Sequence, residues 1–250
     1  MLEFKNVSFK YPEDDYVMME NLSFSVEDHA FISIIGASGC GKSTIFRLIN
    51  GLEKPDAGEI LVDGQPISGL KQYSAFMPQK DMLFPWRTIE KNLYLPMEMQ
   101  HISKEEKKRR AEEVLAQVGL SEYMKKYPKD LSGGMKQRVA FARTLLSGAE
   151  MLLLDEPFSA LDFQTRLAVC DDVWTILRRE KKTAILVTHD LSEAVSMADR
   201  VLVLTKRPAT ICADICIQFK KENATPFERR SEPEFKDYFN EIWKELNLHG

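Results

Sequence analysis

The sequence contains no apolar run close to the roughly 18–20 residues that a helix needs to cross a bilayer. Its first residues, 1–5, have none of the apolar character of a signal peptide. We therefore expect an intracellular protein that reaches a membrane only through a partner. Repeats and low-complexity segments are also absent, and Lys+Arg 34 against Asp+Glu 38 leaves a net charge of -4. This balance gives no electrostatic indication of nucleic-acid binding, so no nucleic-acid partner is expected.

Cysteine is scarce, and the four residues lie far apart or on apolar segments: Cys40, Cys170, Cys212 and Cys216. Cys212 and Cys216 would share one face of a strand, which leaves a metal pair as an alternative. A plain core or surface role is favoured, because no histidine or second cysteine pair lies nearby to complete a ligand set. Reduced thiols, as in a cytosol, fit this usage.

The most informative segment that is present runs from residue 36 to residue 44 and matches the pattern G-x-x-x-x-G-K-[ST]. Residues 31–35 before it predict a buried strand, and residues 43–49 after it predict a helix. Glycines let the backbone wrap closely around a polyphosphate, and the free N–H groups at the helix start face the anion. Lys42 is expected at the β- and γ-phosphates, and the Ser43 hydroxyl on Mg²⁺. The residues expected to bind the nucleotide here are Gly36, Ala37, Ser38, Gly39, Cys40, Gly41, Lys42, Ser43 and Thr44. The alternative is a glycine-rich turn beside a surface lysine, which the flanking strand and helix disfavour.

The first 80 residues are predicted to be rich in strands, over residues 2–4, 7–9, 22–26 and 31–35. Residues 59–67 predict a hairpin around Asp63-Gly64, and residues 74–77 a short strand. From about residue 83 to residue 147 the apolar spacing becomes helical. A capping box at Ser103–Glu106 predicts a helix that ends at Gly119, and Ser132 precedes a second helix over 135–146.

Two near-continuous apolar segments, 151–154 and 183–187, flank a helix predicted over 164–179. Such segments are typical of parallel strands that are covered on both faces. The predicted architecture is an α/β core with a helical insertion. The chain of 250 residues, 44% hydrophobic, is long enough to bury it.

The apolar segment 151–154 runs directly into two carboxylates, Asp155 and Glu156. Catalytic groups of α/β sheets collect at the carboxyl ends of the strands, where the glycine-rich loop also lies. Asp155 is expected in the Mg²⁺ shell, and Glu156 as the general base for the attacking water. Two merely solvent-exposed acids are the alternative.

Between these motifs, residues 131–138 (LSGGMKQR) resemble the signature sequence of ATP-binding-cassette (ABC) proteins, with Met135 where the family more often has Gln. The other motifs of the family occur in order. Tyr11 is similar to the aromatic residue that stacks on adenine, and Gln79 to the glutamine of the Q-loop. Residues 159–162 (SALD) resemble the D-loop, and His189 the switch histidine. For Tyr11 and His189, an ordinary core position is the alternative.

The resemblance spans about residues 2–207 and implies a P-loop NTPase fold of the ABC ATPase type. It has an N-terminal antiparallel β subdomain and an inserted helical subdomain at about 83–147. We expect an ATPase domain over 1–207 and a C-terminal extension over 208–250. The extension ends in an amphipathic helix, either packed back on the body or docking a partner.

The resemblance also implies how the sites work. Ser132, as an N-cap, prepares a second anion site at a helix start. In the family, the segment corresponding to Ser132, Gly133 and Gly134 closes over the ATP of a second copy, so a homodimer forms on ATP binding. Asp162 of the D-loop is also expected to bind the nucleotide. Ser43, Gln79 and Asp155 would hold Mg²⁺. Lys42, Glu156 and His189 would be catalytic, with His189 at the γ-phosphate.

Residues 82–88 (MLFPWRT) lie in the region where ABC transporters meet a membrane subunit, and burial in the helical subdomain is the alternative. The Leu-Phe-Pro-Trp-Arg pattern, Met135 and residues 203–208 are similar to the nitrate/sulfonate/taurine-type importer ATPases, and thiamine-precursor importers share much of the pattern. This implies two membrane-spanning permease subunits, an extracytoplasmic binding protein met indirectly, and a place on the cytoplasmic face of the cell membrane.

Two other classes are weighed against the importer ATPase. A soluble ABC ATPase with a non-transport partner usually has tandem cassettes or a long coiled coil, and this chain has one cassette and no heptad run. A nucleotide-binding regulator without turnover is disfavoured by Glu156 and His189.

Overall fold

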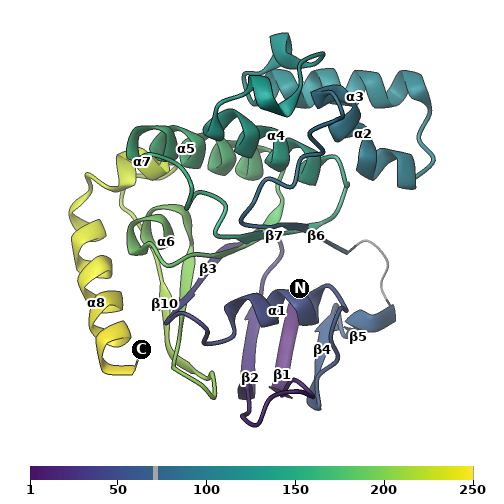
Figure 1. The fold of residues 1–250 in the computed structure, drawn as a ribbon. Coiled ribbons are helices and arrows are strands. Elements are labelled where there is room, and N and C mark those ends of the chain that lie inside the picture. The colour runs from purple at the N-terminus through teal and green to yellow at the C-terminus, as the bar shows by residue number, and fades with distance from the viewer. Residues whose placement is uncertain (70–72, 250) are drawn as a thin grey trace.

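The computed structural model describes residues 1–69 and 73–249, whose strands form two sheets (Figure 1). The smaller sheet is antiparallel with the order β2-β1-β4-β5. It contains β1 (Leu2–Phe9), β2 (Met19–Val26), β4 (Ala57–Val62) and β5 (Gln65–Pro66). The first two predicted segments therefore merge into one strand, β1, which keeps pairing with β2 across register shifts.

The larger sheet has the order β10-β9-β3-β8-β7-β6, and its pairs are parallel except β10–β9. It contains β3 (Phe31–Gly36), β6 (Ser74–Met77), β7 (Met151–Asp155), β8 (Thr183–Val187), β9 (Arg200–Leu204) and β10 (Ile211–Cys216). Because β10 pairs with β9, the segment beyond residue 207 contributes the edge strand of this sheet.

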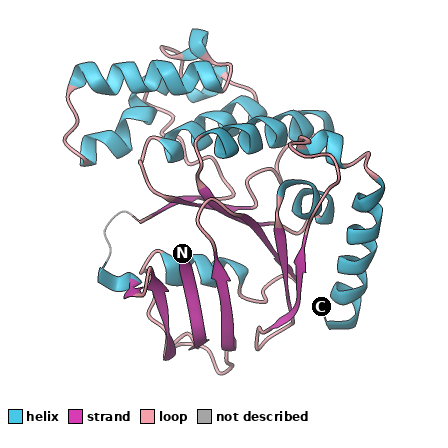
Figure 2. Cartoon of the chain, turned by 180° about the vertical axis from the view of Figure 1, so that it is seen from behind, coloured by secondary structure: helices cyan, strands magenta, loops and turns pink. Residues whose placement is uncertain are grey.

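Side chains alternate between two cores, one on each face of the larger sheet. On one face Ile32 and Ile34 pack with helix α1 (Lys42–Ile49) and the smaller sheet. On the other face Phe31 and Ile35 pack with most of the remaining helices. Figures 1 and 2 show α1 between the two sheets and those helices beyond the larger sheet. Burial on both faces explains why the parallel strands are continuously apolar.

The helical insertion contains α2 (Ile89–Met99), α3 (Lys104–Gln117) and α4 (Gly133–Leu145). Ser103 caps α3 by accepting from the Glu106 N–H, but the predicted capping box forms only by half. The Glu106 carboxylate bonds instead to Arg109 and Arg110, because two guanidinium partners outcompete one backbone N–H. Gly119, with φ +70, ends the helix as expected.

Helices α5 (Phe163–Arg179), α6 (Leu191–Met197), α7 (Pro226–Arg229) and α8 (Pro233–His249) complete the chain. Helix α8 lies against α6, β9 and β10, with Ile242 fully buried and Trp243 exposed. The packing alternative for the C-terminal helix is thus confirmed. Among the described residues, no helix is both long enough and apolar enough to span a membrane.

Candidate nucleotide-binding site

The glycine-rich loop connects β3 to α1 at the carboxyl edge of the larger sheet. Adjacent parallel strands bring their carboxyl ends to one edge, so the loops after β7, β8 and β9 gather around it. A cavity of about 260 Å³ opens there. It is lined by Met18, Ser38, Gly39, Gly41, Lys42, Ser43, Thr44, Glu156 and Arg207.

Lys42, the first residue of α1, is folded into the loop. Its ammonium donates to the carbonyl oxygens of Gly36 (2.8 Å) and Ala37 (2.9 Å), and the side chain is 8% exposed. Gly41 precedes α1 at φ +110 and provides no side-chain cap, so the first N–H groups of the helix face the cavity unpaired by a side chain. Charge and helix start together make this loop a cradle for an anion.

Ser43 and Asp155, which the sequence separates by more than a hundred residues, meet in this cradle. The Ser43 hydroxyl donates to Asp155 Oδ2 at 3.0 Å. Burial, with the neighbouring Glu156 charge, raises the pKa of the Asp155 carboxyl despite the Ser43 bond and Lys42. A partly buried carboxylate beside a hydroxyl is an oxygen-only donor set that suits Mg²⁺, whose charge would offset the desolvation.

Glu156 lies at the junction of two other predicted residues. Its Oε2 accepts from Gln79 Nε2 at 3.1 Å and lies 3.1 Å from His189 Nδ1. Its backbone has φ +46, an uncommon conformation for a residue with a Cβ, and its N–H donates to the carbonyl of Val187 on β8. Such strain at a strand end is typical of functional positions. Gln79 also donates to the Ser159 hydroxyl, so its side chain points at Glu156 and the D-loop rather than at Ser43.

Tyr11, the residue expected to stack on adenine, lies on the other side of the cradle. Its hydroxyl is 3.2 Å from Thr44 Oγ1, and its ring meets Phe9 edge-on at 4.8 Å. Thr44 belongs to the glycine-rich loop motif, so Tyr11 is adjacent to the site although it is partly packed against the core.

The signature segment does not line this cavity. Ser132 caps α4 by accepting from the Met135 N–H at 3.3 Å, and both Ser132 and Gly133 are exposed. A Cβ on Gly134 would overlap Thr165 on α5, so this glycine is needed where α4 and α5 approach closely. Asp162 caps α5 by accepting from the Thr165 N–H at 3.1 Å. Within one chain, therefore, Ser132, Gly133, Gly134 and Asp162 are not assembled with the glycine-rich loop.

Two polar residues of α4 that sequence reasoning missed bind the Q-loop backbone. Gln137 is buried and donates to the Gln79 carbonyl at 3.2 Å. Arg143 donates to the carbonyls of Asp81 and Met82, both at 2.8 Å. The sequence feature that could have revealed them is a pair of long polar side chains, six residues apart, in a helix that is otherwise largely buried.

Residues 82–88 divide between core and surface. Leu83 is buried, whereas Met82, Phe84 and Trp86 are exposed, Trp86 by 71%. The rings of Phe84 and Trp86 lie 5.2 Å apart. We call Met82, Phe84 and Trp86 the aromatic patch. Asn92, fully buried on α2, fixes the loop by accepting from the Phe84 N–H and donating to nearby carbonyls.

A second missed group joins the D-loop to the switch histidine. Arg166 on α5 donates to the Leu161 carbonyl and to Asp190 Oδ2, each at 3.0 Å. Its Nε lies 3.8 Å from Glu193, whose carboxylate accepts from the Thr188 hydroxyl at 2.6 Å. Burial raises the pKa of Glu193 to about 7. These contacts hold the backbone on both sides of His189.

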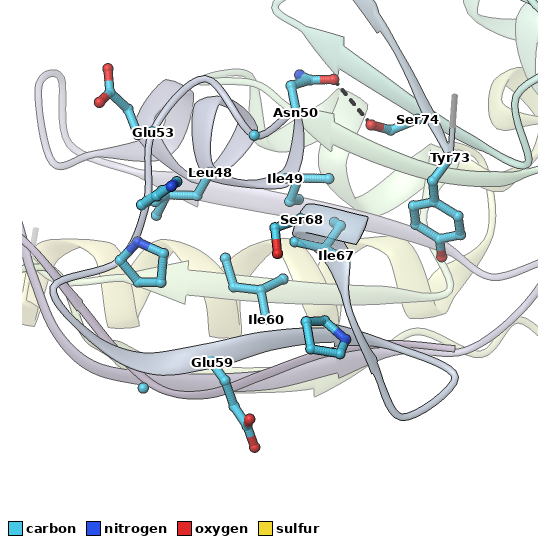
Figure 3. Close-up of a pocket in the computed structure, with 15 residues that line it drawn as sticks. Leu48, Ile49, Asn50, Glu53, Glu59, Ile60, Ile67, Ser68, Tyr73 and Ser74 are labelled. Atoms are coloured by element: carbon cyan, nitrogen blue, oxygen red, sulfur yellow. Dashed lines mark hydrogen bonds between the residues drawn. The ribbon is translucent and has the colours of Figure 1, made fainter. Parts of the chain in front are cut away.

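A larger cavity of about 640 Å³ lies elsewhere, between α1 and β4 (Figure 3). It is lined by residues such as Leu48, Ile60 and Tyr73, and Asn50 accepts there from the Ser74 hydroxyl at 3.0 Å. None of the predicted nucleotide-binding residues lines it.

Among the described residues, no cluster of three or more His, Cys, Asp or Glu could hold a metal, so Cys212 and Cys216 have no such ligand set.

The chain is similar to known proteins over most of its length. The family model described as "ABC transporter" matches residues 19–159. The nitrate import ATP-binding protein NrtD of Synechocystis is 41% identical over 230 residues, covering 90% of this chain and 86% of that protein. The formylaminopyrimidine import ATP-binding protein ThiZ of Halalkalibacterium halodurans is 42% identical over 208 residues, covering 83% and 81%. The dimeric structure of the ATP-binding cassette MJ0796 bound to ADP and Pi superimposes with a TM-score of 0.75 at 30% identity, covering 88% of this chain and 100% of that one.

Proposed function

This chain belongs to the ABC transporter family as an ATPase that powers import, and we propose that it hydrolyses ATP at the cradle around Lys42 to drive uptake of a small solute. The solute would be of the nitrate, sulfonate, taurine or thiamine-precursor kind. Relatives named for the import of nitrate, formylaminopyrimidine and aliphatic sulfonates support this range. The observation that best supports ATP hydrolysis is that Ser43, Asp155 and Glu156 lie together at one edge of the sheet. The non-transport alternative has no support among these relatives.

Each group in the cradle has a role in this proposal. Lys42 would exchange its bonds to two neutral carbonyls for bonds to phosphate oxygens, which are stronger because both partners are charged. Tyr11 would lie against the adenine. Ser43 and Asp155 would hold Mg²⁺, and Gln79 would join them if its side chain turned away from Glu156 and Ser159. The ion would neutralise phosphate charge.

Glu156 would take the proton of the attacking water as general base, an effect worth roughly 10²–10⁴ in rate. Gln79 and His189 already contact its carboxylate and would orient the base and the γ-phosphate. His189 is 62% exposed at its side chain, so it has room to reach a phosphate in the cavity.

A homodimer completes the site. The exposed N-terminus of α4 at Ser132 and Gly133 is a helix start without a ligand in its own chain, and we propose that it covers the ATP of a second copy. The dimeric state of the MJ0796 cassette supports this arrangement. Loss of the γ-phosphate would release the two copies and open the dimer.

In the dimer, the two copies of the aromatic patch are the proposed contacts with two membrane-spanning permease subunits. The permease subunits would receive an extracytoplasmic binding protein on the opposite side of the membrane. An exposed aromatic cluster on a backbone fixed by Asn92 and Arg143 suits a specific interface. The chain would therefore act on the cytoplasmic face of the cell membrane.

The test is reconstitution with the permease, followed by measurement of ATP turnover with binding proteins loaded with candidate solutes. We expect one loaded binding protein to stimulate turnover, and Lys42→Ala to abolish it through loss of ATP binding. Unchanged ATP affinity of Lys42→Ala in calorimetry would remove the cradle from the proposal.

A further inference from the structure

Arg207 brings a second positive charge to the mouth of the nucleotide cradle. It follows β9, and the pairing of Leu204 with Gly36 places the end of β9 beside the start of the glycine-rich loop. The side chain lines the same cavity as Lys42, although the two residues are far apart in sequence. No recognised motif of the sequence includes this position in the site.

Two contacts hold the guanidinium in place. Its Nε donates to the carbonyl of Gly39 at 2.5 Å, and its carbon lies 4.6 Å from the ring centroid of Tyr16. Tyr16 is in the loop between β1 and β2 that also carries Tyr11, so Arg207 joins this loop to the glycine-rich loop. A stacked, hydrogen-bonded guanidinium loses little further entropy when it binds an anion.

The loop leaves space for this side chain. Gly39 has φ +77, and a Cβ at this position would lie 2.5 Å from Arg207 Nη2. The glycine thus serves two purposes, because it permits the left-handed backbone and lets the guanidinium approach the loop.

The charge of Arg207 is not neutralised by a carboxylate in the described part of the chain, and its recorded partners are a carbonyl and an aromatic ring. Lys42 likewise bonds only to carbonyls and a thiol there. Two cations and one carboxylate, Glu156, line the cavity, so the cations outnumber the acid and the cavity attracts a polyphosphate. The Nη groups of Arg207 provide further N–H donors that suit phosphate oxygens.

We propose that Arg207 is a nucleotide-binding residue whose Nη groups contact the phosphates of ATP, with Tyr16 as the platform that orients it. The inference rests on the proposed function, because it assumes a nucleotide in the cradle. It adds a phosphate contact from the loop after β9, a segment for which the sequence predicted no nucleotide-binding role.

The experiment measures the affinities of ATP, ADP and AMP by calorimetry for the full chain, Arg207→Ala, Arg207→Lys and Lys206→Ala. Lys206 is the matched control, since it is exposed, adjacent and of the same charge, and does not line the cavity. We expect Arg207→Ala to weaken ATP about tenfold, the lower end for a charge-assisted contact. The effect should shrink through ADP and vanish for AMP. Arg207→Lys should recover only part of the ATP affinity, because lysine restores the charge but not the stacked guanidinium. Lys206→Ala should bind ATP like the parent chain.

An ATP affinity of Arg207→Ala equal to that of Lys206→Ala would overturn the inference. Equal weakening of ATP, ADP and AMP would also overturn it, since the residue would then act on the base or only on the shape of the loop. The thermal midpoint of Arg207→Ala without nucleotide separates a folding defect from lost binding. If Lys42→Ala loses ATP while Arg207→Ala keeps it, this inference fails and the proposed function stands.

Discussion

The Ser43 hydroxyl donates a hydrogen bond to Asp155 Oδ2 at 3.0 Å. This bond joins the glycine-rich loop after β3 to the end of β7, two strands that are separated in the sheet by β8. The two residues were expected to share Mg²⁺ on the basis of separate motifs. Because the two side chains meet, their shared role on Mg²⁺ can be tested by measuring ATP binding with Mg²⁺ and without it.

Asp155→Asn should weaken ATP binding in the presence of Mg²⁺ and leave binding in EDTA nearly unchanged. Without nucleotide the variant should be as stable as the parent chain or more so at pH 7, because burial raises the pKa of the Asp155 carboxyl and disfavours its charged form. Calorimetry with and without Mg²⁺, beside thermal melts, gives both results. Equal losses with Mg²⁺ and with EDTA would contradict a metal role.

Glu156→Gln should keep ATP binding and lower turnover by at least about 10², because the general base is lost while the shape of the side chain is kept. Since hydrolysis can no longer open it, an ATP-bound dimer should accumulate in light scattering. The exposed Glu122 offers a control, and Glu122→Gln should remain active. Turnover of Glu156→Gln near the parent rate would remove Glu156 from the mechanism.

Cys40 should react slowly with thiol reagents although it lies within the glycine-rich loop. Its side chain is 2% exposed, and it packs beneath Gly36, where a Cβ would lie 2.9 Å from Cys40 Sγ. The exposed Cys216 should be labelled first. Mass spectrometry over time, with Cys216→Ser as the control, measures the order. Labelling of Cys40 before Cys216 would mean that the loop opens readily in solution.

Glu193 should make stability fall as pH rises from about 5 to about 8. Its folded pKa of about 7 lies above the ordinary glutamate pKa of 4.5. Between these pH values the folded state binds a proton that the unfolded state lacks, and raising the pH removes that advantage. Glu193→Gln should flatten this slope and stabilise the chain relative to the parent at pH 8. Urea unfolding at several pH values measures it, and an unchanged slope would refute the assignment.

Trp86→Ala should weaken binding to the permease while ATP binding by the isolated chain stays unchanged. The aromatic patch lies outside the nucleotide cavity, and Trp86 is its most exposed member. Trp243→Ala on α8 is a matched control, because Trp243 is 53% exposed and far along the chain. Pull-down with detergent-solubilised permease compares them. Equal binding by both variants would move the interface away from the patch.

Local patterns predicted most of the fold. The strands over 31–35, 151–154 and 183–187 were correct because burial on both faces leaves a continuous apolar run. Of the capping box predicted at Ser103, only the Ser103 bond forms. The pattern could not tell that Arg109 and Arg110 would bind the Glu106 carboxylate instead. The start of α4 was placed two residues late, because Gly133 and Gly134 are poor helix formers that Ser132 and packing against α5 hold in the helix.

The amino-acid order by itself determined the chemistry of the glycine-rich loop, the two carboxylates after an apolar strand and the capping serine, because each depends on neighbours within one turn or one strand. Only the tertiary structure decided which distant groups meet, among them Gln79 with Glu156, Arg143 with the Q-loop and Arg207 with Gly39. Sheet order brings strand ends together whatever their separation along the chain, and no local pattern records that order.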